Sequence, residues 1–209
     1  MITIVDYGVG NTASLINMCD YLGVVAEVSG DAHAIARADS LVLPGVGAFD
    51  KAMDALRSRG LIEALNEAVL VRKVPVLGVC LGMQLLGRSS EEGQATGLGW
   101  IDADAKKLAP PAGANMRIPH MGWAEVRPLR NTPLFAVRAE AERFYFAHSY
   151  FMMCDRGTDV AAVVDYGGEL CCAIDKENIH GVQFHPEKSH RFGMRLLQAF
   201  STLTPTRNP

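Results

Sequence analysis

A cysteine in this chain lies in a context that suits nucleophilic catalysis. Cys80 falls within residues 74–87, VPVLGVCLGMQLLG, where a short apolar run reaches Gly78, turns through Cys80 to Gly82, and continues into residues typical of a helix. A strand that bends sharply into a helix through glycine, nucleophile and glycine forms a nucleophile elbow, which lifts one side chain above the sheet. The pattern predicts a reactive thiol at Cys80. The alternative is a buried apolar cysteine, which is what most isolated cysteines are.

A base and a carboxylate that could activate this thiol lie near the end of the chain. Residues 181–189 read GVQFHPEKS, and His185 and Glu187 are two positions apart. In an extended segment such residues point the same way, and Pro186 favours extended backbone. A thiol needs a base to become a thiolate, and the resulting imidazolium needs a carboxylate to orient it. We therefore expect a Cys80–His185–Glu187 triad.

Two backbone segments could stabilise an oxyanion formed at Cys80. The N–H of Leu81 faces outward at the start of the predicted helix. The loop 44–49, PGVGAF, follows a predicted strand at 40–43, so in a parallel sheet it would lie beside the elbow. Gly47 in this loop is the expected second contributor.

A glycine motif near the N-terminus offers a different function. Gly8, Gly10 and Ala13 match G-x-G-x-x-G/A between a strand and a helix, and Glu27 could serve as the ribose acid. The motif would suit a nucleotide-binding module, but Glu27 follows Ala13 by only 14 residues and the motif does not account for the elbow, so a tight turn at the end of a strand explains it better. A third hypothesis is a free-standing cysteine hydrolase on the same elbow architecture.

The remaining histidines carry weaker signals. His33 and His190 are expected on helix surfaces and His180 at a strand edge. His120 and His148 lie in aromatic-rich segments, where core packing and substrate contact are both open.

The surrounding elements predict an α/β fold that can hold these groups. Apolar runs at 2–5, 24–28, 40–43 and 75–79 alternate with helical periodicity at 15–22 and 49–70, with a break at Gly60. This order is typical of a doubly wound, mostly parallel sheet with flanking helices. Strand-like runs at 123–126, 143–151, 160–164, 170–174 and 179–184 make the second half β-rich, and a last helix is expected at 189–203 with Ser189 as N-cap. One domain over residues 1–209 is expected.

The composition is that of an ordinary globular protein. The net charge of −3 with 21% charged residues gives no surplus that would favour nucleic acid or a membrane surface. The five cysteines are odd in number and lack metal-ligand spacing, so reduced thiols and a cytoplasmic location fit best, with no metal and no cofactor expected. The N-terminus lacks the basic segment of a signal peptide, and no apolar run approaches a membrane span.

Taken together, these motifs resemble the class I, triad-type glutamine amidotransferases. The elbow GVCLGMQ at 78–84, the preceding glycine loop and QFHPE at 183–187 occur in the order of that family. Within it, the segments VDYGVGN at 5–11, LPGVGAF at 43–49, IPHMGW at 118–123 and FHPEKS at 184–189 are most similar to glutaminase subunits of imidazole glycerol phosphate synthases. The resemblance covers essentially the whole chain.

The resemblance implies a specific chemistry and a partner. Cys80 would attack the side-chain amide of L-glutamine to form a thioester, and Gln84, Ser149 and Tyr150 would hold the substrate. Ammonia would pass to a (β/α)₈ cyclase subunit in a heterodimer of histidine biosynthesis. Asn11, Trp123 and Lys188 match positions at that interface.

Two departures concern the ammonia acceptor. Ala124 replaces the asparagine that usually follows IPHMGW, next to the expected interface. The segment 188–194, KSHRFGM, resembles paralogous subunits that serve amidotransferases of surface-sugar (lipopolysaccharide) synthesis. Supply of ammonia to such an enzyme is therefore the alternative function.

Overall fold

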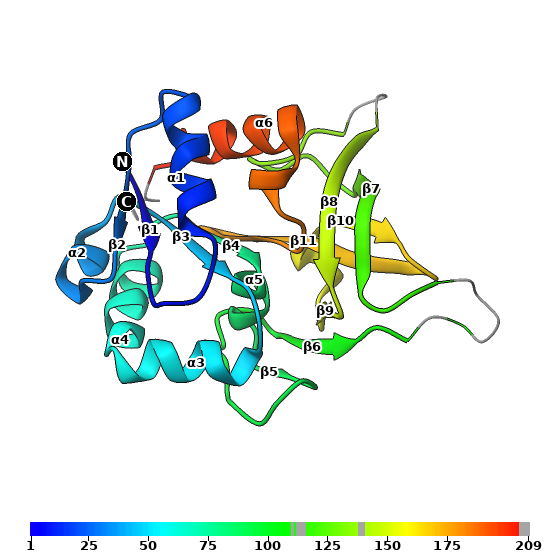
Figure 1. Ribbon diagram of the computed structural model, residues 1–209, viewed down its shortest axis with the longest axis horizontal. Coiled ribbons are helices and arrows are strands. Elements are labelled where there is room, and N and C mark those ends of the chain that lie inside the picture. Colours follow the sequence, from blue (N-terminus) through cyan, green and yellow to red (C-terminus); the bar gives the residue numbers. More distant parts are fainter. Residues whose placement is uncertain (110, 112–115, 138–140, 205–209) are drawn as a thin grey trace.

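The computed structural model describes residues 1–109, 111, 116–137 and 141–204, and it consists of a large mixed sheet with helices on both faces (Figure 1). Five neighbouring strands run parallel, in the order β2 (Ala26–Ser29), β1 (Ile2–Val5), β3 (Ser40–Gly45), β4 (Val76–Cys80) and β12 (Ile179–Val182). Four antiparallel strands extend the same sheet: β11 (Glu169–Lys176), β10 (Val160–Asp165), β7 (His120–Pro128) and β8 (Glu142–His148).

A smaller sheet and the helices complete the fold. The three-stranded sheet is formed by β5 (Ser89–Ser90), β6 (Ala103–Lys107) and β9 (Tyr150–Cys154). The α-helices are α1 (Thr12–Tyr21), α2 (Ala32–Arg37), α3 (Phe49–Ser58), α4 (Leu61–Asn66), α5 (Leu81–Leu85) and α6 (His190–Ser201). A π-helical turn, η1 (Glu67–Val71), follows α4, and 3-10 turns occupy η2 (Gly157–Asp159) and η3 (Pro186–Lys188).

The central strands are apolar throughout because both faces of the sheet are covered. In β3, Leu41 and Leu43 pack into the cluster that lies under α2, α3 and α4, whereas Val42 packs into the cluster under α1 and α6. Figure 1 shows these two groups of helices on opposite sides of the sheet. Burial of alternate side chains in two separate cores fixes the register of β3, since a slip of one residue would exchange them.

The predicted α/β class is confirmed, and β7, β8, β10, β11 and β12 of the β-rich second half belong to the same large sheet as the N-terminal strands. The run predicted at 143–151 is two strands, because the chain leaves the large sheet after β8 and enters the small sheet at β9. The short strands β5 and β6 and helix α2 were not predicted. Within the described ranges, no helix is long and apolar enough to cross a membrane.

Candidate active site

The strand–turn–helix predicted around Cys80 is present. β4 ends at Cys80, whose φ of 55° and ψ of −109° lie in a region that non-glycine residues rarely adopt, and α5 begins at the next residue. Glycines make this bend possible: a Cβ at Gly82 would lie 1.8 Å from the carbonyl oxygen of Leu43, and one at Gly78 would lie 2.7 Å from that of Gly82. The strained conformation of Cys80 is therefore held by close packing of α5 on β3 and β4.

The register of the sheet brings the predicted base next to this thiol. Val182 of β12 pairs with Val79 of β4, so the chain leaves β12 beside Cys80 and His185 follows three residues after Val182. His185 is 3% exposed, and its Nδ1 lies 2.9 Å from Oε1 of Glu187. Because a carboxylate accepts, Nδ1 carries the proton and the other ring nitrogen is left for Cys80.

The backbone around His185 is fixed by a buried serine. His185 N donates to the carbonyl oxygen of Tyr145 at 2.9 Å. Ser189 Oγ donates to His185 O at 2.6 Å and accepts from Tyr145 N at 3.0 Å. Ser189 precedes α6 as expected, but its hydroxyl makes no capping bond to that helix. Its side chain instead ties the histidine segment to β8.

The electrostatic environment favours a charged imidazole at His185. Burial lowers the pKa of His185, but hydrogen bonds to Cys80 and to Glu187, together with the charges of these two groups, outweigh it and raise the pKa to about 9. His185 is therefore charged at neutral pH, which is the form that can stabilise a neighbouring thiolate.

The loop that contains Gly47 lies beside the thiol and is anchored at both ends. At its start, Tyr7 Oη donates to Pro44 O at 2.6 Å. At its end, Phe49 N, in the first turn of α3, donates to Glu92 Oε2 at 2.8 Å. The carboxylate of Asp50 accepts from the backbone N–H groups of Gln94 and Ala95 at 2.9–3.1 Å. Glu92 and Asp50 thus form a reciprocal clamp between the start of α3 and the segment after β5.

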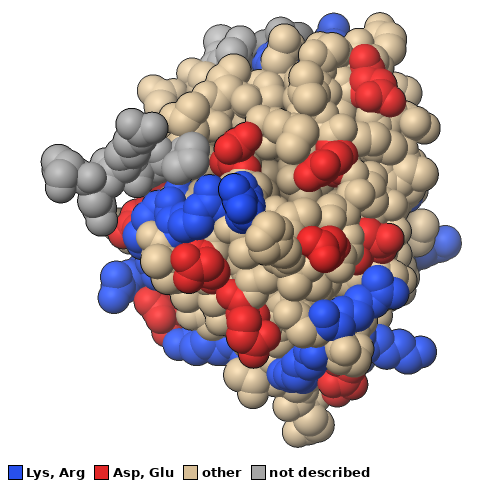
Figure 2. Space-filling model, turned by 90° about the vertical axis from the view of Figure 1, so that its left-hand side faces the viewer, with Lys and Arg blue, Asp and Glu red and all other residues tan. Residues whose placement is uncertain are grey.

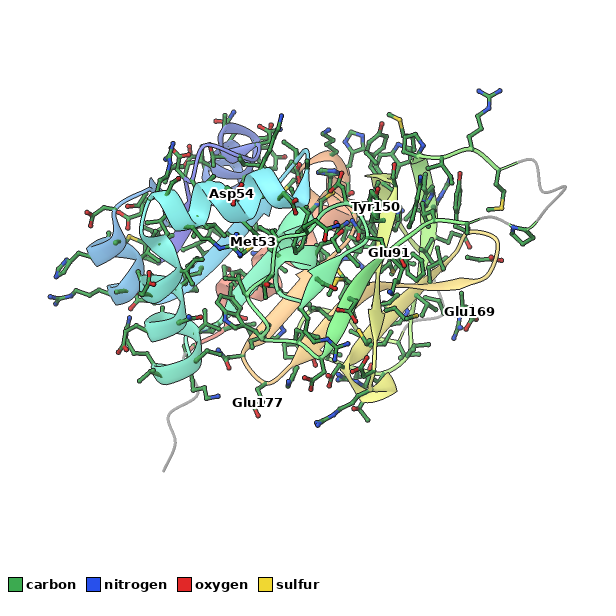
Figure 3. The ribbon with its side chains drawn as sticks, turned by 90° about the horizontal axis from the view of Figure 1, so that it is seen from below. Met53, Asp54, Glu91, Tyr150, Glu169 and Glu177 are labelled. Carbon is green, nitrogen blue, oxygen red and sulfur yellow. The ribbon has the colours of Figure 1, made fainter. Side chains whose placement is uncertain are left out.

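These elements enclose a cavity of about 390 Å³. Predicted site residues along its wall are Gly47, Cys80, Leu81, Gln84, Ser149, Tyr150, His185 and Lys188. Glu187 lies behind His185, whereas Asn11 and Trp123 do not line the cavity. Figure 3 shows Tyr150 where the helical half of the molecule meets the β-rich half.

Two functional candidates were missed from the sequence. Glu92 lines the cavity as well as holding Phe49, but it lies in a polar segment whose residue types give no signal of a site. Gln183 is completely buried, and its Nε2 lies 3.7 Å from Cys80 Sγ. Its place immediately before Phe184 and His185 was the available signal.

The histidines of the aromatic segments form a buried neutral pair. His120 Nδ1 lies 3.1 Å from His148 Nε2, and His148 Nδ1 donates to Tyr150 O at 2.8 Å. Burial lowers the pKa of both histidines to about 4. His148 borders the cavity, whereas His120 stacks between Phe146 and Tyr166.

The expectation for His180 was wrong. Its side chain is 2% exposed and lies 2.8 Å from Asp175, because β12 is an interior strand of the sheet.

Two of the three predicted interface residues lie together beside the cavity. Trp123 is 39% exposed and lies edge-on to Tyr145, and Lys188 Nζ lies over the same ring. Asn11 caps α1 through a bond from Ser14 N at 3.2 Å. Ala124 lies on the other face of β7 from Trp123 and packs against the core under α1 and α6. The replacement at Ala124 therefore does not alter the face that carries Trp123.

The glycine motif at the N-terminus forms a tight turn beside the active-site loop. Gly8 and Gly10 have positive φ angles, and a Cβ at Gly10 would lie 3.0 Å from Pro44. Glu27 accepts a hydrogen bond from the hydroxyl of Thr3 at 3.1 Å.

On the face shown in Figure 2, acidic and basic side chains are interspersed rather than gathered into one patch of either sign.

Comparison with solved structures supports the fold. One structure described as a glutamine amidotransferase superimposes with a TM-score of 0.74 at 17% identity, covering 96% of this chain and 97% of that one. The PurLQS structure from Thermotoga maritima gives a TM-score of 0.74 at 16% identity, covering 95% and 96%. At these identities the likeness concerns the fold alone.

Comparison of sequences identifies the family. The model of the class-I glutamine amidotransferase family matches residues 3–202. Imidazole glycerol phosphate synthase subunit HisH 2 of Pseudomonas aeruginosa is 45% identical over 97% of this chain and 100% of its own length. HisH 2 of Methanococcus maripaludis is 46% identical over 96% of this chain and 98% of its own length. The chain therefore belongs to the class-I glutamine amidotransferase family, among the relatives of the HisH subunits.

Proposed function

We propose that this chain is the glutaminase subunit of an imidazole glycerol phosphate synthase. It hydrolyses L-glutamine to glutamate and ammonia, and it needs neither a metal nor a cofactor for this reaction. The observation that supports the proposal most strongly is the placement of the Cys80 thiol beside the buried His185–Glu187 pair, at the wall of a cavity of about 390 Å³. The family of the chain and the names of its relatives point to the same chemistry.

The first half of the reaction is acylation of the thiol. Cys80 Sγ attacks the side-chain amide carbon of glutamine, and the carbonyl oxygen becomes an oxyanion. Backbone N–H groups at Leu81 and in the Gly47 loop stabilise this oxyanion. His185 then gives its proton to the departing nitrogen, so ammonia leaves and a glutamyl thioester remains.

The second half is hydrolysis of the thioester. His185, now neutral, takes a proton from water, and the resulting hydroxide attacks the thioester carbon. The carbon–sulfur bond breaks, glutamate leaves, and the thiolate is regenerated beside a protonated His185. Glu187 holds the imidazole in one orientation throughout and stabilises its charged form.

The cavity walls suit the α-amino and α-carboxylate groups of glutamine. Gln84 donates from Nε2 to Tyr150 O, so its Oε1 is left as an acceptor for an ammonium group. Ser149 and Tyr150 line the cavity beside it and offer hydroxyl and backbone groups for the carboxylate.

A partner subunit explains why apolar side chains are exposed next to this cavity. Met121 and Trp123 lie on the same face of β7 and are 63% and 39% exposed, and Ile118 nearby is 43% exposed. Exposed apolar groups of this kind mark interaction surfaces. We propose that a (β/α)₈ cyclase covers them in a cytoplasmic heterodimer of histidine biosynthesis, with contacts to Asn11, Trp123 and Lys188. Direct transfer of ammonia avoids its protonation and loss in water.

The test is glutamine hydrolysis by the chain mixed with a histidine-pathway cyclase and its nucleotide substrate. We expect strong stimulation by the partner, loss of glutaminase activity in Cys80→Ala, and an unchanged partner reaction when ammonia is supplied directly. Stimulation by a surface-sugar amidotransferase in place of the cyclase would assign the ammonia to that acceptor. Strong hydrolysis without any partner, or full activity of Cys80→Ala, would refute the proposal.

A further inference from the structure

Gln183 is a buried polar residue to which the reaction described above gives no role. It follows the last residue of β12, directly beside the end of β4, and its backbone N donates to Cys172 O at 2.9 Å. Its side chain is fully enclosed, and Nε2 lies 3.7 Å from the sulfur of Cys80. This distance is within the range of a hydrogen bond to sulfur, which is longer than one to oxygen.

The orientation of the Gln183 amide is fixed by a chain of hydrogen bonds with a known direction. Tyr150 O can only accept, so the group of Gln84 that lies 3.2 Å from it is the amide NH₂. The same NH₂ lies 3.1 Å from Gln183, which must therefore present its oxygen there. The NH₂ of Gln183 is left to face Cys80 Sγ. The backbone carbonyl of Tyr150, linked to Gln183 through Gln84, thus determines that a donor, and not an acceptor, points at the nucleophile.

A donor aimed at sulfur distinguishes the charged form of the nucleophile from the neutral form. A thiolate accepts hydrogen bonds strongly, whereas a thiol accepts weakly. In a site with little water, an N–H group that is already in place stabilises the anion without reorganisation. Once Cys80 carries a glutamyl group, the sulfur is a poor acceptor, and the bond regains its strength when the thiolate leaves.

We propose that Gln183 is a catalytic residue that donates a hydrogen bond from its side-chain amide to Cys80 Sγ and stabilises the thiolate. Gln84 acts as a positioning residue for it, in addition to its proposed contact with glutamine. This inference rests on the proposed function of Cys80 as the nucleophile. His185, which Glu187 orients, supplies the opposing charge from the segment after β12, and Tyr7 approaches the thiol from the segment after β1. Gln183 adds the neutral donor in this set.

The test is the rate at which iodoacetamide alkylates Cys80 across a pH series, measured on the full chain. Gln183→Met removes the donor and fills the space, whereas Gln183→Glu keeps the shape and an acceptor for Gln84 but places an anion next to the sulfur. For Gln183→Met we expect alkylation about tenfold slower at neutral pH and a profile moved about one pH unit higher. For Gln183→Glu the loss should be greater.

A merely structural role gives a different result. If Gln183 only fills space, variants with unchanged near-UV circular dichroism will alkylate at the wild-type rate with the wild-type pH profile, and the proposal is then wrong. A measurement on the unmodified sequence does not depend on how the variants fold. The side-chain amide NMR signals of Gln183 should shift when Cys80 is alkylated, and an unchanged signal contradicts the proposal.

The alkylation assay is independent of the glutaminase proposal. Iodoacetamide reports on the thiolate whether or not glutamine is the substrate. Failure of the wild-type complex to hydrolyse glutamine would therefore refute the proposed function, while a normal alkylation rate in Gln183→Met would refute only the role of Gln183.

Discussion

Replacement of Glu187 by glutamine tests the electrostatic contribution of the carboxylate to the active site. The variant keeps an oxygen that can accept from His185 Nδ1, which lies 2.9 Å from Oε1 in the native protein. It removes the negative charge with little change in volume. The side chains of His185 and Glu187 are only 4% and 2% exposed, so solvent screens their interaction weakly. A large effect on activity with a small effect on folding is therefore expected.

The size of the effect follows from the raised pKa of His185. That pKa is about 9, against an ordinary value of 6.5, which corresponds to ~3.4 kcal/mol in favour of the imidazolium. Cys80 and Glu187 both raise it, each by a hydrogen bond and by charge, and burial opposes them. If Glu187 accounts for half of the net effect, its charge contributes ~1.7 kcal/mol, or roughly 20-fold in the equilibrium constant for protonation of His185.

The sign of the pH dependence is also determined. A raised pKa keeps His185 protonated up to about pH 9, so loss of the carboxylate must lower the pH at which the imidazolium gives up its proton. In Glu187→Gln the alkaline limb of the rate profile should move down by a little more than one pH unit, so the rate should fall about 2.5-fold at pH 8 and about 16-fold at pH 10.

The assay is cyclase-stimulated glutamine hydrolysis from about pH 6 to pH 10, with Glu177→Gln as the matched control. Glu177 is 68% exposed and pairs with Lys73 at the periphery, at the edge of the molecule far from Tyr150 in Figure 3. The control should behave as wild type, since exposed pairs contribute little. An unchanged alkaline limb in Glu187→Gln would refute the electrostatic reasoning, and an equal effect in both variants would show that it is not specific to the site.

Three further predictions concern the elements that hold the site. Gly82→Ala should be destabilised by more than about 4 kcal/mol in urea unfolding, because its Cβ would lie 1.8 Å from a carbonyl oxygen. Gly60→Ala, where φ is 65° and the added Cβ meets open space, should lose only about 1–2 kcal/mol. Equal losses in the two variants would contradict the packing argument. Ser189→Ala should lose about 1–3 kcal/mol and reduce kcat, since it removes the two hydrogen bonds through which the hydroxyl links His185 O to Tyr145 N, whereas partly exposed Ser201→Ala should match wild type in the same two measurements. Backbone N–H groups hold the pKa of Asp50 below its ordinary 3.8, so its contribution to stability is present above about pH 4 and is lost as the pH falls. In Asp50→Asn, stability should therefore fall less steeply on acidification, and kcat should be lower because the oxyanion loop is no longer held. A stability curve on acidification equal to that of wild type would show that the contacts of Asp50 do not stabilise the fold.

The parts of the fold that the sequence predicted are those where apolar pattern and glycine placement agree. Ile2–Val5 and residues 40–43 are buried on both faces and are apolar at almost every position, so their strands were predicted to within two residues. The elbow at Cys80 was predictable because Gly78 and Gly82 are needed sterically by the bend. Both signals are local in the sequence.

The elements that were missed lack such local signals. β6 buries only Ala103 and Ala105 between charged residues, so its alternation carries little hydrophobic contrast. The division of the run 143–151 depends on which sheet each half joins, which is a property of the tertiary fold. Ser189 was predicted as an N-cap, and its hydroxyl is used for His185 and Tyr145 because these groups lie closer in the folded chain.

In the candidate site, too, the residues with local sequence signals were predicted and those that depend on the tertiary fold were missed. Cys80, His185 and Glu187 were predicted from residue type and spacing, and their roles stay a prediction until they are tested. The series of hydrogen bonds from Tyr150 through Gln84 and Gln183 to the thiol joins three segments that are far apart in the sequence, so no sequence pattern could have revealed it. The clamp of Glu92 and Asp50 is missed for the same reason, since it links helix α3 to a polar loop more than 40 residues away.

The most direct test of Cys80 as the nucleophile of a glutaminase is mass spectrometry after incubation with a glutamine analogue that alkylates thiols, such as 6-diazo-5-oxo-L-norleucine. With the cyclase complex, we predict one adduct per chain, located on Cys80, formed at a rate that excess L-glutamine reduces. The Cys80→Ala variant should form no such adduct under the same conditions. An adduct on Cys19, Cys154, Cys171 or Cys172, or labelling of Cys80 that glutamine does not slow, would contradict the account.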